Sequence, residues 1–236
     1  MKFEKSRKYD MNFLKENMMG PNCIKLLEDL TKDMQIEKGM RVLDLGCGKG
    51  LTSIFLAKEF GATVYATDLW IPATENYQRF KEMGLNDKII PIHANALDLP
   101  YADEFFDMAV SIDAYHYFAM GSDYMNDRLA PLVKTGGEIA ICVPGLIKDL
   151  DETPEELKPY ISDKDFMTFR SCGWWNTLLK QSKRFSINAI WEPNGFDEIW
   201  NDWLACDNEY AIRDRDFIKD NDGKYLNFVS IVGKKV

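Results

Sequence analysis

The sequence predicts an α/β fold with a Rossmann-like, doubly wound sheet, and two observations lead to this prediction. Short apolar runs alternate with helical patterns between residues 35 and 143, which is typical of a parallel sheet with helices on both faces. The first apolar run ends in a turn with glycine at positions 46, 48 and 50, and a helical pattern follows directly. Right-handed crossovers between such strands favour a doubly wound arrangement.

The elements of the first half follow from the apolar spacing and from the residues that begin and end helices. Gly61 and Gly84 each stand where a helical pattern stops, and Pro72 stands where one begins. In chain order we expect a helix over 22–34, a strand over 41–45, a helix over 51–60, a strand over 62–68, a helix over 72–84, and strands over 88–94 and 105–113.

The second half continues the alternation and then departs from it. In chain order we expect a mostly helical stretch over 123–134, a strand over 136–144, helical segments over 145–182, a strand over 184–193, a helix over 195–210 and a strand over 224–235. We expect the segments after the fifth strand to lie over the sheet edge rather than to form a separate domain. The whole is therefore a seven-stranded sheet with an antiparallel last strand and helical caps at the N-terminus and after the fifth strand.

Composition and charge narrow the possible partners. The chain has 236 residues, of which 46% are hydrophobic, enough for one α/β domain. Its net charge of -9 disfavours a nucleic-acid substrate, because nucleic-acid binders usually present a basic face. No stretch reaches the ~18 apolar residues of a membrane span, the charged start does not resemble a secretory signal, and the five cysteines form no CxxC pair. We expect a soluble cytoplasmic protein with reduced thiols, no metal site and no stable membrane insertion.

The glycine-rich turn and Asp68 together indicate a nucleoside site. Glycine lets a ligand approach the backbone without a Cβ atom in the way. The helix that follows directs its unpaired N–H groups and the positive end of its dipole towards that ligand. Asp68 ends the next strand, and the ends of the first two strands of a doubly wound sheet are neighbours at the ligand crevice. A carboxylate in that position accepts hydrogen bonds from ribose hydroxyls.

The glycine spacing does not fit a dinucleotide site, because G-x-G-x-x-G requires glycine where this chain has Leu51 or Ser53. The pattern D-x-G-x-G-x-G from Asp44 to Gly50 instead resembles the first motif of the class I S-adenosylmethionine-dependent methyltransferases. The resemblance covers roughly residues 35–143 and includes the stretches "HANALDLPY" and "FFDMAVSIDAYHYF". It points to the small-molecule type, in the UbiE-like or cyclopropane-synthase-like branch.

The resemblance implies that S-adenosylmethionine is the cofactor and assigns roles to particular positions. The glycine turn holds the methionine end, Asp68 binds the ribose, and Leu69 packs on the adenine with Trp70 beside it. Where the family often has Gly-Asp-Ala after the third strand, this chain has Ala-Asn-Ala over 94–96, so an uncharged amide replaces the usual carboxylate. The implied cofactor-binding residues are Asp44, Gly46, Cys47, Gly48, Asp68, Leu69, Asn95, Ala96 and Asp113.

The resemblance also implies methyl transfer to a small-molecule acceptor by in-line displacement, in which the protein mainly aligns the reacting groups and excludes water. A base is needed only where the nucleophile must lose a proton. The catalytic candidates are His116 and Tyr117 on the loop after the fourth strand. His116 serves as a base, orients the acceptor, or packs structurally against the sheet edge. Asp113 contacts the methionine moiety directly or through water.

We expect one methyltransferase domain over 1–236. Its parts are an N-terminal helical lid (1–34), a cofactor-binding half (35–143), an acceptor-side insertion (144–183) and the C-terminal strands and helix (184–236). Within the lid, the segment 9–22 folds over the cofactor and brings Met18 and Met19 near it. Within the insertion, the aromatic stretch 166–179 forms a wall of the acceptor pocket.

Other functions on the same fold stay open. An aminopropyl transferase needs acids to hold a polyamine, and no paired-acid motif marks the loop after the fourth strand. A protein that binds S-adenosylmethionine without turnover would present the same binding residues. Three converging thiolates from Cys142, Cys172 and Cys206 would suit arsenic, and a lipid acceptor would favour a basic amphipathic helix, which the sequence lacks. The oligomeric state does not follow from the sequence.

Overall fold

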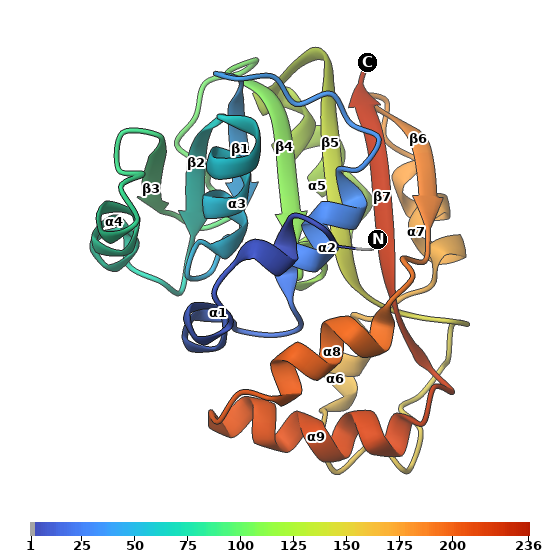
Figure 1. Cartoon of the computed structure of the whole chain (residues 1–236). Helices are drawn as coiled ribbons and strands as arrows, with labels where there is room; N and C mark the ends of the chain where they lie inside the picture. The colour runs from blue at the N-terminus through green and yellow to red at the C-terminus, as the bar shows by residue number, and fades with distance from the viewer. Residues whose placement is uncertain (1–2) are drawn as a thin grey trace.

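The computed structural model describes residues 3–236 and contains one seven-stranded sheet in the order β3-β2-β1-β4-β5-β7-β6 (Figure 1). The strands are β1 (Arg41–Leu45), β2 (Thr63–Asp68), β3 (Ile89–His93), β4 (Phe106–Ile112), β5 (Val133–Leu146), β6 (Phe185–Trp191) and β7 (Leu226–Lys235). Strands β1 to β5 pair in parallel, whereas β7 runs antiparallel to both β5 and β6. The predicted doubly wound sheet with an antiparallel last strand is confirmed.

The helical segments alternate with the strands up to β5 and then gather between β5 and β7. In chain order they are η1 (Ser6–Lys8), α1 (Met11–Asn17), α2 (Cys23–Leu30), α3 (Leu51–Phe60), α4 (Ala73–Glu82), η2 (Tyr115–Tyr117), α5 (Ser122–Tyr124), the π-helical η3 (Met125–Leu129), η4 (Ala130–Leu132), α6 (Asp163–Phe166), α7 (Cys172–Leu179), α8 (Phe196–Leu204) and α9 (Glu209–Asn221).

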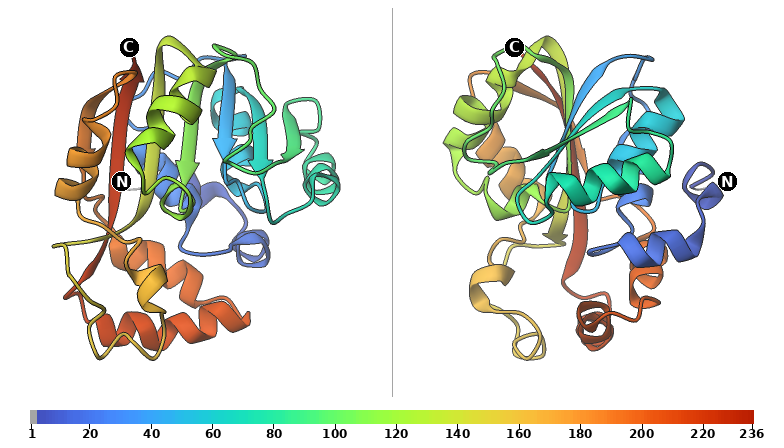
Figure 2. Two further views of the ribbon diagram at one scale, coloured as in Figure 1. Left: turned by 180° about the vertical axis from the view of Figure 1, so that it is seen from behind. Right: turned by 90° about the vertical axis from the view of Figure 1, so that its left-hand side faces the viewer.

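Helices cover both faces of the sheet (Figure 2). On one face α2 and α3 bury Leu27 and Phe55 completely in the larger apolar cluster. On the other face the short segments from η2 to η4 and helix α7 bury Tyr115, Leu129 and Trp175 in a second cluster. The sheet is therefore apolar on both sides, which explains why its central strands read as continuous apolar runs.

A helical cap, formed by residues 147–170 and 195–221, lies below the carboxyl ends of the parallel strands in Figure 1. Its own apolar cluster includes the buried side chains of Leu157 and Phe217. The last residues of β5 pair with the first residues of β7, and both strands contribute to this cluster. The cap is thus carried by an extension of two neighbouring strands and faces the edge of the sheet where ligands bind in doubly wound folds.

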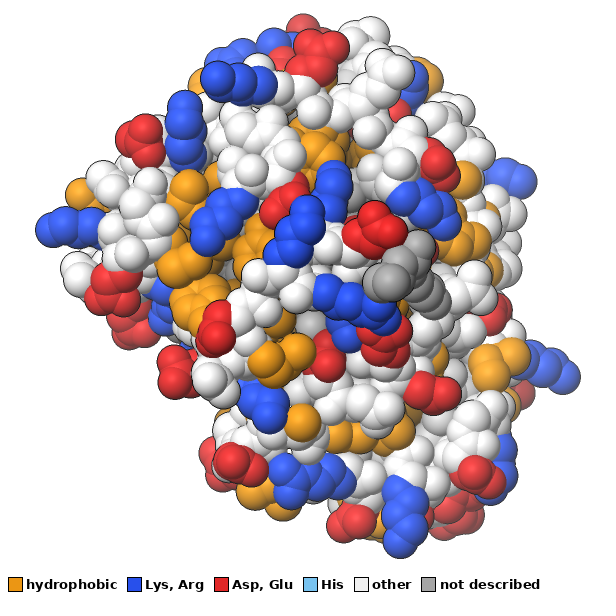
Figure 3. Space-filling model, in the orientation of Figure 1, with side chains coloured by type: hydrophobic (Ala, Val, Ile, Leu, Met, Phe, Trp, Pro, Cys, Tyr) orange, Lys and Arg blue, Asp and Glu red, His pale blue; other side chains and the backbone are white. Residues whose placement is uncertain are grey.

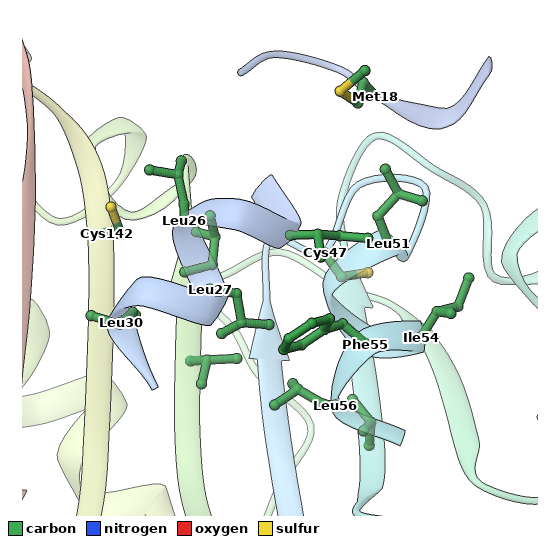
Figure 4. Packing of buried hydrophobic residues seen from close by; sticks show 14 of the residues in the cluster. Met18, Leu26, Leu27, Leu30, Cys47, Leu51, Ile54, Phe55, Leu56 and Cys142 are labelled. Carbon is green, nitrogen blue, oxygen red and sulfur yellow. The ribbon is translucent and has the colours of Figure 1, made fainter. Parts of the chain in front are cut away.

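The N-terminal segment crosses the same end of the sheet. Lys49 Nζ donates to the backbone carbonyl of Glu16 at 3.0 Å, and Arg79 Nε donates to Asn17 Oδ1 at 2.8 Å. Met18 is buried over the start of α3, as Figure 4 shows. These contacts hold the segment against the turn that follows β1.

Asn22 joins this segment to the cap. Its Oδ1 accepts from the backbone N–H groups of Ile24 and Lys25 at 3.1 and 3.2 Å and so caps α2. Its Nδ2 donates to Asp202 Oδ2 at 2.7 Å, and Lys25 Nζ forms ion pairs with Asp202 at 2.7 Å and Glu198 at 3.0 Å. One polar cluster therefore fixes α8 of the cap against α2.

The expected helix over 195–210 is wrong, because the chain forms two helices, α8 and α9, in this region. The second begins at Asn208, whose side chain accepts from the backbone N–H of Ala211 at 3.0 Å. Only Ala211, Phe217 and Asn221 of α9 are buried, so its apolar pattern is too sparse to be recognised in the sequence.

Two other expectations are corrected in part. The stretch 123–134 is a succession of short α, π and 3-10 turns, and β5 already begins at Val133, so this strand is longer than expected at both ends. After β5, α7 packs on the sheet as expected, whereas Phe166 of α6 is buried in the cap cluster. The cap draws on two separate parts of the chain, which periodicity alone does not reveal.

Replacing Asn22 with Ala should lower the free energy of unfolding by about 2 kcal/mol, the upper range for loss of an N-cap, because the bond to Asp202 is lost as well. Asn208→Ala is the matched control, since that side chain caps α9 with a single bond, and it should cost about 1 kcal/mol. Urea unfolding measures both values. Equal losses for the two variants would contradict the linking role of Asn22.

Candidate functional site

A first cavity of about 490 Å³ lies at the carboxyl ends of the parallel strands, within the size range of small-molecule sites. The ends of β1, β2 and β4, the turns after β1, β2, β3 and β4 and the start of α3 form most of its wall, and residues 17, 19–21 and 23 form the rest. The residues predicted from the sequence that line it are Gly46, Cys47, Gly48, Asp68, Leu69, Asn95, Ala96, Asp113 and Tyr117.

The turn after β1 depends on Gly46 for a close approach between two strand ends. Its backbone φ is 77°, and a Cβ atom there would lie 2.2 Å from the Cβ of Ala114. The N–H of Gly46 donates to the carbonyl of Thr67 at 2.8 Å, so the turn is also held to β2. Gly48 contacts the N-terminal segment, since a Cβ there would lie 3.0 Å from Met19 Sδ. Bare backbone thus faces the cavity.

Asp68 accepts three backbone hydrogen bonds. Its Oδ2 accepts from the N–H of Gly48 at 2.8 Å, and its Oδ1 accepts from the N–H groups of Trp70 and Ile71 at 2.7 and 2.9 Å. A carboxylate offers about four lone-pair sites, so one site on Oδ2 is left for a ligand. The sequence predicted this carboxylate as part of a ligand site. Its hydrogen bonds show that it also holds the turns after β1 and β2 in place.

Asp44 is buried beneath the glycine turn. Its Oδ2 accepts from the hydroxyls of Thr52 and Ser53, each at 2.6 Å, while its Oδ1 is buried and has no partner among the described residues. Burial raises the pKa of Asp44 to about 6, and the two hydroxyls act in the opposite direction. Because an unpaired buried acceptor is unfavourable, a donor at the floor of the cavity would satisfy it.

Asn95 has a local role in its turn. Its Oδ1 accepts from the backbone N–H of Leu97 at 2.9 Å, which fixes the orientation of the amide, because only the oxygen can accept from an N–H group. Both N–H groups of the amide then stay available as donors. At this position the amide can therefore donate to a ligand, and the second lone pair of Oδ1 can still accept from one.

A second cavity of about 1090 Å³ adjoins the first and lies between the sheet and the helical cap. The two cavities share seven lining residues, and these form a common wall. They are Met19, Gly20, Pro21, Lys49, Trp70, Asp113 and Tyr117. A ligand in the first cavity and a ligand in the second would therefore meet at this wall.

The comparisons with known proteins agree with this arrangement. Residues 42–137 match the methyltransferase domain family. The chain is 31% identical over 130 residues to Methyltransferase GfsG of Streptomyces halstedii, in an alignment that covers 53% of this chain and 46% of that protein. The matched region is similar to the class I S-adenosylmethionine-dependent methyltransferases. The alignments span about half of the length of these relatives, or less.

Solved structures of methyltransferases share the fold of this chain. Phosphoethanolamine N-methyltransferase 2 of Haemonchus contortus, solved with S-adenosyl-L-methionine, has a TM-score of 0.74 at 20% identity and covers 99% of this chain and 59% of its own. Geranyl diphosphate C-methyltransferase of Streptomyces coelicolor A3(2) has a TM-score of 0.67 at 15% identity, and the match covers 98% of this chain and 76% of that one. That enzyme was solved with Mg²⁺, geranyl-S-thiolodiphosphate and S-adenosyl-L-homocysteine. At these identities the similarity concerns the fold alone.

His116 lines the second cavity and is fully buried. Neither ring nitrogen has a hydrogen-bond partner among the described residues, and its ring centroid lies 4.1 Å from that of Tyr117 and 5.7 Å from that of Phe169. Burial lowers the pKa of His116 to about 3, although Asp165 acts in the opposite direction. The imidazole is therefore neutral at physiological pH and has one nitrogen that accepts and one that donates.

The aromatic stretch 166–179 contributes to the second cavity only at its start. Thr168 and Phe169 line the cavity, whereas Trp175 is buried against Tyr115 in the sheet cluster, with ring centroids 5.8 Å apart. The helical period of α7 turns its tryptophan towards the sheet, so most of this expected wall belongs to the core.

The cap helices supply wall residues that the sequence did not assign to the site. Trp200 and Trp203 come from α8, and Tyr210, Arg213 and Asp214 come from α9. Trp200 and Trp203 lie within the helix expected over 195–210, whereas the charged pair on α9 carried no signal because that helix was not expected. Contacts between distant parts of the chain bring all five of these cap residues to the cavity.

The three cysteines of the alternative metalloid site lie on different parts of the fold, Cys142 in β5, Cys172 in α7 and Cys206 after α8. Within residues 3–236, no group of three or more His, Cys, Asp or Glu side chains is arranged to hold a metal ion. Cys142 is buried in β5 beside Ser230, and Cys206 is buried with its thiol 3.6 Å from the carbonyl of Asp202. Over the same described residues, every helix is too short or too polar to cross a membrane.

The raised pKa of Asp44 predicts a pH-dependent difference in stability. The folded protein holds the carboxyl proton of Asp44 more tightly than the unfolded chain does. Protonated Asp44 therefore adds to the free energy of unfolding below pH 3.8, and this addition is lost as the pH rises through about 6. Relative to Asp44→Asn, the unfolding free energy of the unmodified protein should therefore fall across this range, by about 3 kcal/mol in total. Urea unfolding at a series of pH values measures it, with the exposed Asp98→Asn as control. Parallel curves for the unmodified protein and Asp44→Asn would contradict this account.

Proposed function

We propose that the protein transfers a methyl group from S-adenosylmethionine to a small-molecule acceptor in the cytoplasm. The observation that carries the proposal is the pair of adjoining cavities with a common wall, one bounded by the glycine turn and Asp68 and the other by the helical cap. When bound, the cofactor supplies a methyl group that its sulfonium already activates for displacement.

The residues of the first cavity fit this cofactor. The remaining lone-pair site of Asp68 Oδ2 suits a ribose hydroxyl, and Asn95 suits the nitrogen edge of the adenine as a donor. The unpaired Oδ1 of Asp44 suits the α-ammonium of the methionine moiety, reached directly or through water. Bare backbone at Gly46 and Gly48 leaves room between these groups.

The remaining residues position the acceptor and exclude water. The common wall combines Met19 and Gly20 of the N-terminal segment with Trp70 and Tyr117. The rings of Trp70 and Tyr117 lie 5.5 Å apart and are 64% and 56% exposed, so their faces are available to a ligand. Alignment of two ligands across such a wall lowers the activation free energy of a displacement by several kcal/mol.

The proteins whose solved structures share this fold act on different acceptors, so the fold does not single out one substrate. One is an N-methyltransferase of phosphoethanolamine and another is a C-methyltransferase of geranyl diphosphate. A nucleic-acid acceptor is disfavoured by the net charge of -9. On the face drawn in Figure 3, Lys and Arg side chains are interspersed with Asp and Glu rather than gathered into one basic patch.

Replacing Asp68 with Ala should weaken the binding of S-adenosylmethionine by about 1.5–3 kcal/mol, the scale of one charge-assisted hydrogen bond. Isothermal titration calorimetry measures the affinity, and circular dichroism checks that the variant is folded. Asp98→Ala, at an exposed position outside the cavity wall, is the control and should bind normally. An unchanged affinity of the folded Asp68→Ala protein would refute the ribose role.

Replacing His116 with Ala should lower turnover at least tenfold and leave cofactor affinity within about twofold, since His116 lines only the second cavity of the two. His116→Phe keeps an aromatic ring without the nitrogens and should show the same loss. Formation of S-adenosylhomocysteine with an accepted substrate is the measurement. Normal turnover of the His116→Phe variant would assign His116 to packing.

A further inference from the structure

The second cavity carries more unpaired negative charge than positive charge. Its charged lining residues are Lys15, Glu16, Lys49, Asp113, Asp165, Asp207, Arg213 and Asp214. Arg213 pairs with Asp214 at 2.9 Å, and Asp207 pairs with Arg215 at 3.6 Å. Among the described residues, the lining then has three carboxylates without an ion pair, Glu16, Asp113 and Asp165, against two such cations, Lys15 and Lys49. The net charge of -9 of the whole chain also attracts cationic ligands.

Asp113 is the one carboxylate among the seven residues of the common wall. It lies in the common wall, and no residue within 3–236 donates a hydrogen bond or forms an ion pair with its carboxylate. Its Oδ2 lies against the N-terminal segment, 2.5 Å from where a Cβ on Gly20 would be. Burial and the neighbouring Asp214 raise the pKa of Asp113 to about 7. This carboxylate therefore lacks a cationic partner within the protein.

The backbone at Asp113 is held in an unusual conformation that keeps the carboxylate at the wall. Its φ is 55°, in the left-handed region that few residues other than glycine, asparagine and aspartate adopt. Its N–H donates to the carbonyl of Cys142 at 2.8 Å, which ties the turn to β5. Such conformations persist where the surrounding structure imposes them, and they are common at functional sites.

Aromatic side chains line the second cavity together with this carboxylate. Trp70 and Tyr117 share the common wall with it, and Phe169 and Trp200 line the second cavity. The faces of such rings attract organic cations, and the attraction is stronger where water is excluded. An unpaired carboxylate among aromatic rings is the arrangement that binds an ammonium group.

We propose that the methyl acceptor is a small amine that binds in the second cavity as its ammonium ion, with the Asp113 carboxylate as the counter-ion. This inference rests on the proposed function. An ammonium nitrogen has no lone pair, so it must first lose one proton, which Asp113 accepts and later releases to water. The nitrogen then forms the bond to the methyl carbon as the carbon–sulfur bond breaks and its electron pair stays on sulfur.

Calorimetry on the protein saturated with S-adenosylhomocysteine tests the proposal without turnover. The probes are primary and secondary amines with aliphatic, aromatic and amino-sugar skeletons, each paired with the alcohol of the same skeleton, such as 2-phenylethylamine with 2-phenylethanol. We expect at least one amine to bind tenfold or more tightly than its alcohol, and no alcohol to bind more tightly than its amine. A panel without any amine preference would overturn the proposal.

Asp113→Asn removes the charge and keeps a residue type that tolerates the left-handed backbone. We expect it to abolish the amine preference and to leave the affinity for S-adenosylhomocysteine within threefold. Glu209→Gln, which removes one exposed charge from the start of α9, should leave both unchanged. If Asp113→Asn weakens the binding of S-adenosylhomocysteine tenfold and leaves the amine preference unchanged, Asp113 binds the cofactor and the proposal is wrong. Failure of the unmodified protein to bind S-adenosylhomocysteine would instead contradict the proposed function.

Discussion

The arrangement of the site depends on how the end of β1 is held to the end of β2. The carboxylate of Asp68 accepts from Gly48 on one side and from Trp70 and Ile71 on the other, and the carbonyl of Thr67 accepts from Gly46. Both turns are thereby fixed around one charged group, with backbone rather than side chains facing the cavity. A side chain on Gly46 would also collide with Ala114 after β4, so three strand ends meet at the same glycine.

The helical cap and the N-terminal segment turn this crevice into two adjoining cavities. They are held together by the polar cluster of Asn22, Lys25, Glu198 and Asp202. Since Lys25 is nearly buried, its two carboxylate partners offset the unfavourable burial of its charge. The acceptor side of the molecule is thus joined to the cofactor side by charges that lie outside both cavities.

The sequence predicted the cofactor half well, because local signals determine it. The strand over 41–45 and the helix over 51–60 have the expected bounds, since a buried apolar run and the glycines at either end of the helix define them. The nine cofactor-binding candidates also fall where expected, eight along the first cavity and Asp44 beneath it. That these residues bind the cofactor is still a prediction, whereas their convergence on one edge of the sheet follows from the topology alone.

The sequence predicted the acceptor half less well, because distant contacts determine it. Trp175 and Phe169 belong to one aromatic stretch, yet one packs in the sheet core and the other faces the second cavity. Helix α9 shows little apolar periodicity, so neither the helix nor the position of Arg213 and Asp214 was expected. Nor does periodicity reveal that Asp113 adopts a positive φ and has no partner in the described chain. These features arise only once β5 and β7 bring the two parts of the cap together.

The central claim is that the turn after β1 and the carboxylate after β2 bind one sulfonium nucleoside. A crystal structure of the protein with S-adenosylhomocysteine tests this claim most directly. The account predicts the ribose within hydrogen-bonding distance of Asp68 Oδ2, the homocysteine moiety along Gly46 and Gly48, and the sulfur directed at the wall that contains Asp113. A nucleoside bound elsewhere, or a crystal of the folded protein that does not take it up at saturating concentration, would contradict the account.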